Sequence, residues 1–250
     1  MRIGVFALLA SIIVLAPALD ARAAPMPQPA LTIAYYTTPA NWLAFRHSIK
    51  DEFIPQLKGL KSSGMLSSYH VYFNRDVDGP NWNAMAVVEF KDAAGLSNWD
   101  ARAEPAGLSQ AALALTSSIE TTRCDLVRHD SAWDVAKAPV TLVIPYKYLV
   151  SDDDYKQYLD GYTIPQLKGW IKAGILSRYA VLMDQYPAGR PWNAMLLLEY
   201  RSDAALARRD AVKTKVRTEL ANNPTWKAIS ERKQGIREEL ALTVADDATR

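Results

Sequence analysis

Two glutamates stand at the end of nearly the same phrase. Residues 79–90 read GPNWNAMAVVEF and residues 189–200 read GRPWNAMLLLEY, and in each the glutamate follows the methionine by four residues. A carboxylate that faces an apolar cavity has a raised pKa and can serve as a general base or acid. We therefore take Glu89 and Glu199 as candidate catalytic residues, each at the mouth or wall of a cavity.

Strand alternation divides each phrase into two faces. One face carries the glutamate together with an asparagine, Asn83 or Asn193, and the other, beginning at Trp82 or Trp192, is apolar throughout. We expect the apolar face to pack under helices and the polar face to line an interior. Asn83 and Asn193 are thus candidate ligand-binding residues. The two tryptophans are expected either to face the helices or to anchor the hairpin.

A structural alternative exists for both glutamates. Each could form an ion pair with Arg123 or Arg237 on the last strand of its repeat, or face solvent at a strand end. Tyr36 and Tyr146 also recur at the same offset and could hydrogen-bond a ligand carbonyl, although aromatic residues are common in strands for packing reasons alone.

Histidine and cysteine limit the metal and redox chemistry. None of His47, His70 and His129 has a histidine at the equivalent repeat position, so no multi-histidine metal site is predicted. On the same face of its predicted strand, His70 is followed by Tyr72 and Asn74, whose side chains can form hydrogen bonds. A haem-binding protein with His70 as the axial ligand therefore remains an alternative. The single Cys124 excludes an internal disulfide and is expected to be a small buried hydrophobe.

The chain contains an internal repeat of roughly a hundred residues. Residues 54–92 align on 164–202 without a gap, with 17 identities in 39 positions. Downstream, 122–127 resembles 236–241 at an offset of 114 rather than 110, which sets Arg123 against Arg237. We interpret this as a tandem duplication, with a first unit at 31–135 and a second unit at 140–246.

Each unit follows one order of elements. Apolar spacing and turn residues predict strands, a long helix containing a proline that should kink or break it, a hairpin, further helices and a last strand. The predicted strands are 31–38, 67–75, the phrase at 79–90 and about 120–128, then 141–148, 177–185, the phrase at 189–200 and about 235–244. This β-α-β-β-α-β order specifies an α+β, ferredoxin-like unit whose bare sheet face must be covered. Two units in one chain can cover each other as a pseudo-dimer.

The ends of the third strands carry a family resemblance. VVEFKDAAGL (87–96) and LLEYRSDAAL (197–206) pass from Glu-aromatic-basic into an alanine-rich helix, and this chain resembles the dimeric α+β-barrel superfamily over most of residues 31–245. That superfamily includes antibiotic-biosynthesis-type monooxygenases and EthD-like and NIPSNAP-like proteins. The resemblance implies a barrel whose usual homodimer is fused here. It does not choose a reaction, because members range from cofactor-free oxygenases to haem-binding proteins.

The N-terminus predicts export. Arg2 precedes an apolar run, and Ala21-Arg22-Ala23 offers small residues at a cleavage site, so residues 1–23 are interpreted as a signal peptide followed by a proline-rich segment at 24–30. The mature chain has 27 basic and 26 acidic residues, because Arg2, Arg22 and Asp20 are lost. This balance gives no basic footprint for nucleic acid, and no stable membrane insertion is expected after cleavage.

These patterns favour an exported, periplasmic or secreted protein that binds a small apolar or aromatic molecule between sheet and helices or between the sheets. It could be a cofactor-independent enzyme that uses a carboxylate for proton transfer or oxidation. The alternatives are a non-catalytic binding or interaction module and a haem-binding protein. Either a monomeric pseudo-dimer or a homodimer is compatible with the repeat.

Overall fold

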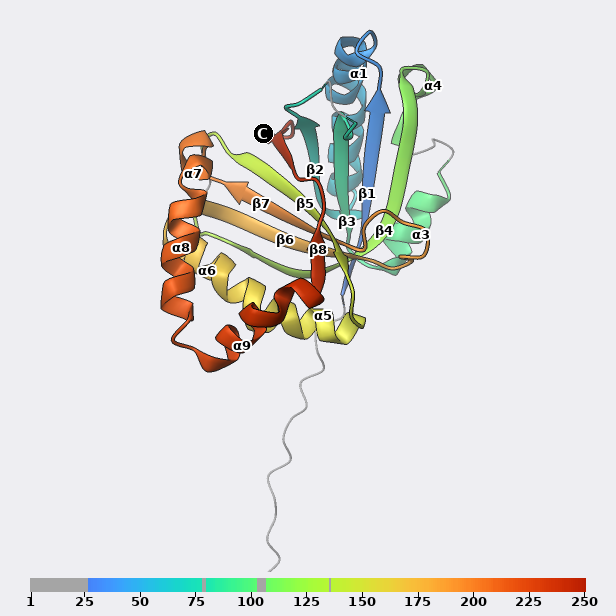
Figure 1. Cartoon of the computed structure of the whole chain (residues 1–250). Coiled ribbons are helices and arrows are strands. Elements are labelled where there is room, and N and C mark those ends of the chain that lie inside the picture. The colour runs from blue at the N-terminus through green and yellow to red at the C-terminus, as the bar shows by residue number, and fades with distance from the viewer. Residues whose placement is uncertain (1–26, 78–79, 103–106, 135) are drawn as a thin grey trace, which may run out of the picture.

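The strands form one closed barrel (Figure 1). The computed structural model describes residues 27–77, 80–102, 107–134 and 136–250, so the predicted signal peptide lies outside the described residues. Within these ranges, eight strands pair in the order β7-β6-β4-β1-β3-β2-β9-β5, and β5 pairs again with β7 to close the ring. A short ninth strand, β8, pairs with the C-terminal end of β5, beyond the part of β5 that pairs with β9.

The two units have the same strand order. The first unit consists of β1 (Gln28–Thr37), β2 (Leu66–Asn74), β3 (Ala84–Phe90) and β4 (Thr116–Ser131). The second consists of β5 (Val140–Tyr148), β6 (Leu176–Asp184), β7 (Ala194–Tyr200), β8 (Arg237–Glu239) and β9 (Thr243–Asp247). In each unit the first and third strands are central, as predicted for the ferredoxin-like topology. The fourth strand of each unit pairs with the second strand of the other.

Helices cover the outside of the barrel. Those of the first unit are α1 (Trp42–Ser48), α2 (Ile54–Ser62), α3 (Ala93–Asp100) and α4 (Gln110–Leu113). Those of the second are α5 (Asp152–Tyr158), α6 (Ile164–Lys172), α7 (Asp203–Ala207), α8 (Arg209–Leu220) and α9 (Pro224–Arg232), followed by the 3₁₀ turn η4 (Lys233–Gly235). No helix in the described ranges is long and apolar enough to span a bilayer.

The predicted break at the helix proline is a π-helical turn. It occupies η1 (Ile49–Phe53) in the first unit and η3 (Leu159–Thr163) in the second, and in both the proline of IPQLKG lies in the first turn of the next α-helix. A proline has no N–H and its ring crowds the carbonyl four residues earlier. The wider turn accommodates both defects without ending the helix.

Three apolar clusters result from the strand faces. The alanines, valine and phenylalanine of β3 pack under the first-unit helices, and the equivalent residues of β7 pack under the second-unit helices, as predicted. Met85, Val87, Met195 and Leu197 fill the barrel interior together with the buried Cys124. Burying each large apolar side chain contributes about 1.5–3 kcal/mol to folding.

Trp82 and Trp192 contradict the prediction that they face the helices. Trp82 belongs to the interior cluster and Trp192 packs against it. Both precede the strands they introduce, at Ala84 and Ala194, so strand alternation does not yet apply to them.

The sequence alignment of the two units also has the wrong register for their first and last strands. Glu89 pairs with Ala30, whereas Glu199 pairs with Thr141, so β1 matches β5 at an offset of 111. Ala30 also pairs with Cys124, and its equivalent Thr141 pairs with Ala245. Cys124 therefore matches Ala245, an offset of 121 rather than 114. Arg123 and Arg237 are therefore not equivalent, because β8 and β9 together replace the long β4.

The two copies of IPQLKG provide a stability test. A Cβ on Gly59 would meet no atom within 4 Å, whereas a Cβ on Gly169 would lie 2.6 Å from Cγ1 of Val216 on α8. Gly59→Ala should therefore stabilise the protein by about 0.5–1 kcal/mol through helix propensity. Gly169→Ala should destabilise it, because the β-branched Val216 has little rotamer freedom to withdraw.

Urea unfolding of the two single variants measures both effects in the same protein. Equal shifts of the same sign would contradict the close α6–α8 contact, which also positions the basic face of α8 described below.

Candidate functional site

A cluster of interacting ionisable side chains lies at one end of the barrel. His70 Nδ1 lies 2.7 Å from Asp247 Oδ2, and its Nε2 accepts a hydrogen bond from Arg178. Arg250 Nη2 lies 2.7 Å from Glu199 Oε2, and Arg250 Nε is 3.6 Å from Asp247 Oδ2. We call these five residues the C-terminal ion cluster. It joins β2 of the first unit to the end of the second.

Glu199 is a structural member of this cluster and not an unpaired carboxylate. Its Oε1 accepts a hydrogen bond from Ser177 Oγ at 2.6 Å, its Oε2 meets Arg250, and the side chain is 5% exposed. Its arginine partner is neither Arg123, which pairs with Asp100, nor Arg237. Glu89 lies at the same barrel end and lines a small pocket of about 190 Å³ with Arg178.

His70 does not fit the role of a haem ligand. Both of its ring nitrogens have protein partners, and its ring stacks on Tyr72 with the centroids 5.9 Å apart. His47 and His129 are exposed, on α1 and β4 respectively. An axial ligand would require His70 to abandon a buried carboxylate and a guanidinium.

Asn83 and Asn193 hold the ends of the first strands. Asn83 Oδ1 accepts from the backbone N–H of Thr37 at 2.8 Å, and Asn193 Oδ1 accepts from that of Tyr148 at 2.8 Å. Asn193 also donates to the carbonyl of Tyr148. The repeated asparagine therefore links the entry of the third strand to the exit of the first, and its amide is already used.

Tyr36 and Tyr146 occupy different faces. The one-residue difference in offset makes Tyr35 the equivalent of Tyr146, since each pairs with the first alanine of its third strand. A shift of one residue moves a strand side chain to the opposite face. Tyr36 consequently lies at a barrel mouth, where its hydroxyl donates to Glu120, whereas Tyr146 lies under the second-unit helices.

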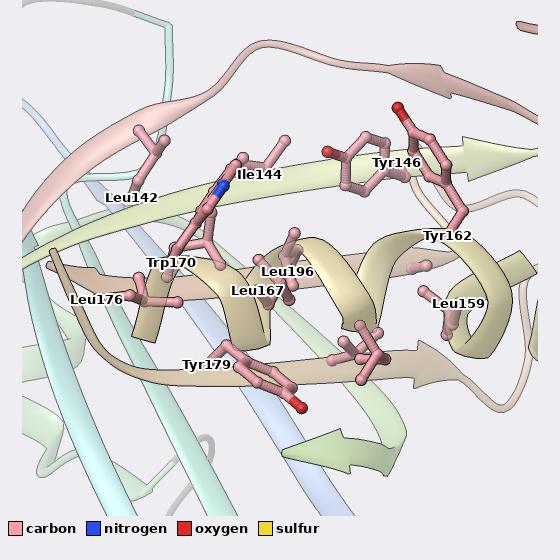
Figure 2. Packing of buried hydrophobic residues seen from close by; sticks show 14 of the residues in the cluster. Leu142, Ile144, Tyr146, Leu159, Tyr162, Leu167, Trp170, Leu176, Tyr179 and Leu196 are labelled. Carbon is pink, nitrogen blue, oxygen red and sulfur yellow. The ribbon is translucent and has the colours of Figure 1, made fainter. Parts of the chain in front are cut away.

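The candidate site is a cavity of about 380 Å³ between the second-unit sheet and its helices, which we call the second-unit cavity. Its wall is aromatic and aliphatic, with polar groups at the rim. Figure 2 shows Tyr162 of η3 and Trp170 of α6 on the side that faces Ile144 and Tyr146 of β5. The lining comprises Ile144, Tyr146, Tyr155, Leu159, Tyr162, Thr163, Gln166, Leu167, Trp170, Val181, Leu196, Leu198, Arg209, Lys213, Arg217, Lys233, Gln234, Arg237 and Glu239.

Two hydrogen-bond donors in this wall have no partner in the described part of the chain. They are the Tyr162 hydroxyl and the Trp170 indole Nε1–H, and both atoms are inaccessible to bulk solvent. The Tyr162 ring is fixed between Tyr158 and Trp226, with centroids 5.3 and 5.0 Å away. A buried donor without an acceptor costs about 1–3 kcal/mol, so an acceptor atom that reached either group would be stabilised there.

Positive charge surrounds the cavity. Arg209, Lys213 and Arg217 follow one another at four-residue spacing along α8, which puts them on one face of that helix. Lys233 and Arg237 add two more cations, against one lining carboxylate, Glu239. Asp210 offsets part of the charge, with its Oδ1 2.6 Å from Lys213 Nζ and 3.7 Å from Arg209 Nη1.

Tyr146 connects the aromatic wall to the charged rim. Its hydroxyl lies 3.2 Å from Glu239 Oε2, and the Arg237 guanidinium lies 4.1 Å from its ring centroid. Burial raises the pKa of Tyr146 well above its usual value; Arg237 opposes this rise and Glu239 adds to it. The phenol therefore stays protonated and acts as a donor.

Haem does not fit the second-unit cavity by its donor set. Its lining contains no histidine, cysteine or methionine, and a tyrosine ligand would need the phenolate form that burial of Tyr146 disfavours. Among the described residues, no group of three histidine, cysteine or acidic side chains converges on a metal position.

The equivalent space in the first unit is smaller, a pocket of about 160 Å³ whose lining includes Ser48, Glu52 and Phe53. Tyr35 packs edge-on against Phe53 with the centroids 5.9 Å apart, and both are buried. At the positions of Tyr158, Tyr162 and Trp170 the first unit has a serine, a glutamate and a leucine. Sequence reasoning missed both this aromatic gain and the row of cations on α8. Two signals in the sequence could have revealed the cavity. They are the positions at which the two repeats differ and the four-residue spacing of the cations.

The C-terminal ion cluster predicts acid sensitivity. Burial alone would raise the pKa of Asp247, but hydrogen bonds from His70 and Thr249 outweigh it and hold the pKa below its usual value. Such a carboxyl stabilises the fold above its unfolded pKa, and the contribution is lost as pH falls through the native pKa. Asp247→Asn should therefore lower the free energy of unfolding by about 3 kcal/mol at neutral pH. The difference in free energy of unfolding between this variant and the wild type should decrease below about pH 4, because the wild-type carboxyl then becomes protonated.

Urea unfolding at neutral and acid pH measures this difference. Glu89→Gln is the matched control, because the Glu89 carboxylate accepts no hydrogen bond in the described residues, and it should change stability by less than about 0.5 kcal/mol. A pH-independent loss in Asp247→Asn would contradict the role of its charge.

Comparisons with known proteins give the fold. No family model and no curated protein matches the chain. A candidate monooxygenase from Lactobacillus acidophilus NCFM is 10% identical, with 88% of this chain and 94% of that chain covered and a TM-score of 0.56. An anthrone oxidase-like protein is 11% identical, with 90% and 94% covered and a TM-score of 0.50. A heme-binding protein from Thermus thermophilus is 13% identical, with 88% and 91% covered and a TM-score of 0.51. The chain has the α+β-barrel fold of these proteins, with two ferredoxin-like units in one polypeptide.

Proposed function

We propose that the protein binds a small aromatic anion in the second-unit cavity. The observation that carries the proposal is the pair of unpartnered donors, Tyr162 Oη and Trp170 Nε1, in an aromatic wall beneath a row of cations. A planar ring can pack against the aromatic wall, and an acceptor atom on it can satisfy the donors. Its negative charge would then meet the α8 face.

The size and composition of the cavity support this class of ligand. A volume of about 380 Å³ falls in the range of small-molecule sites, which combine apolar walls with a few placed polar groups. Gln166 fixes one of the cations, because its Oε1 accepts from Arg217 Nε at 2.7 Å while its Nε2 donates to the carbonyl of Tyr162. A fixed guanidinium loses little entropy when an anion binds.

The proposal concerns binding and not the carboxylate chemistry predicted for Glu89 and Glu199. Neither glutamate lines the second-unit cavity, and Glu199 is engaged by Ser177 and Arg250. A catalytic role at that barrel end would require a polar cluster that joins the two units to open.

Binding can be measured with 8-anilinonaphthalene-1-sulfonate, an aromatic anion whose fluorescence rises in apolar sites. Lys213→Gln should weaken its binding about tenfold, because a hydrogen bond to a charged group contributes about 1.5–3 kcal/mol. Lys215→Gln, an exposed change on the same helix outside the cavity lining, should have no effect. Tyr162→Phe should also weaken binding while leaving the free protein equally or more stable.

The uncharged analogue N-phenyl-1-naphthylamine separates charge recognition from simple apolar binding. It should bind at least about tenfold more weakly than the sulfonate at low salt, and the gap should narrow as salt screens the rim. Equal affinities for the two dyes, unaffected by Lys213→Gln, would contradict the proposal.

We also propose that the protein is exported, on the basis of the signal-peptide pattern at 1–23. Expression of the full chain in a bacterial host should yield a mature form that begins at Ala24, in the periplasmic fraction or the medium. Intact-mass measurement identifies the new N-terminus. A cytoplasmic protein of full length would contradict export.

A further inference from the structure

A second pocket lies at the barrel mouth opposite the C-terminal ion cluster, with a volume of about 190 Å³. It opens between the two units, and the two tryptophans of the repeated phrase, Trp82 and Trp192, both line it. Tyr36 and Glu120 add a phenol and a carboxylate, and Met85 and Met195 form its floor in the interior cluster. We call it the mouth pocket.

The charge of the mouth pocket is opposite to that of the second-unit cavity. Its lining contains no lysine, arginine or histidine, and Glu120 is its one ionisable acid. Glu120 forms no ion pair within the described residues, and its Oε2 accepts a hydrogen bond from Tyr36 at 3.1 Å. The guanidinium of Arg190 donates to the carbonyl of Thr121, and Arg190 is not part of the lining.

Tyr36 is the donor in its hydrogen bond with Glu120. Burial, and then the neighbouring carboxylate, raise the pKa of Tyr36 to about 12, so the phenol remains a donor at neutral pH. Glu120 is itself exposed, which allows its charge to act on a solute that enters the mouth.

The tryptophan rings are available to a ligand. In the described part of the chain neither indole stacks on another ring, and neither Nε1–H is used in a hydrogen bond. Trp192 is partly exposed, and Trp82 is 8% exposed against the interior cluster. Indole faces attract cations through the ring quadrupole, and aromatic cages with a nearby carboxylate recognise methylated ammonium groups.

We propose that the mouth pocket binds the quaternary or methylated ammonium group of a small organic cation. The aromatic side chains supply the ring faces and Glu120 supplies the counter-charge, whereas strongly hydrated metal cations would find a single carboxylate and no further anionic ligand. This site is independent of the second-unit cavity, since the two lie on opposite faces of β5. Val143 and Pro145 line the mouth pocket, and Ile144 and Tyr146 line the second-unit cavity.

Calorimetric titration of the full-length mature protein with choline tests the inference, with 3,3-dimethyl-1-butanol as the uncharged control of the same shape. Choline should bind at least about tenfold more tightly than the alcohol. Trp192→Leu and Glu120→Gln should each weaken choline binding at least about fivefold, whereas Trp133→Leu, a change at a 97% exposed tryptophan elsewhere, should not.

Glu120→Gln alters an exposed side chain and keeps the test valid if Trp192→Leu fails to fold. Equal binding of choline and the alcohol would overturn the proposal, as would choline binding that Glu120→Gln leaves unchanged. Binding of 8-anilinonaphthalene-1-sulfonate to the second-unit cavity is measured in a separate titration. Failure of one proposal therefore leaves the other testable.

Discussion

Pairing of the edge strands between units is the interaction on which the rest of the structure depends. A ferredoxin-like unit leaves its second and fourth strands with unpaired backbone groups, and exposed edges are prone to wrong association. Here β4 pairs with β6 and β9 pairs with β2, so both edges of both units are used within one chain. Closure also buries the bare sheet faces against each other.

This closure determines where space remains. The barrel interior is packed with methionine, leucine and valine side chains, so ligand-sized volume is left at the mouth and beneath the helices. The opposite end holds the C-terminal ion cluster, in which Asp247 and Arg250 bring the chain terminus back to β2 and β7, beside the small pocket lined by Glu89 and Arg178. Partnered buried charges are costly to break one at a time, which fixes the two units relative to each other.

Much of the fold could be predicted from the repeat, because alternation along the third strands and the helical spacing are local properties. The positions of Met85 and Val87 inside, and of Val88 and Phe90 under helices, followed from alternation alone. The register of the first and last strands did not, because an ungapped alignment cannot locate a turn that is one residue shorter. That single residue moved Tyr36 to the mouth and Tyr146 to the cavity.

The candidate site was less predictable for a related reason. The glutamates and asparagines drew attention because they are repeated. In the structure Asn83, Asn193 and Glu199 are already engaged by other residues, and neither glutamate lines the second-unit cavity. The cavity instead depends on residues that differ between the units: the first unit packs Phe53 against Tyr35, and the second has Tyr162 and Trp170 with unpartnered donors. One unit can keep its packing while the other carries a site, so the positions at which the two units differ were the informative signal.

The most direct test of this account is a crystal structure of the protein with bound 8-anilinonaphthalene-1-sulfonate. The account predicts the aromatic rings between α6 and β5, an acceptor within hydrogen-bond distance of Tyr162 Oη or Trp170 Nε1, and the sulfonate beside Lys213 and Arg217. A ligand bound only beneath the first-unit helices or on the outer surface, with the second-unit cavity empty, would contradict it.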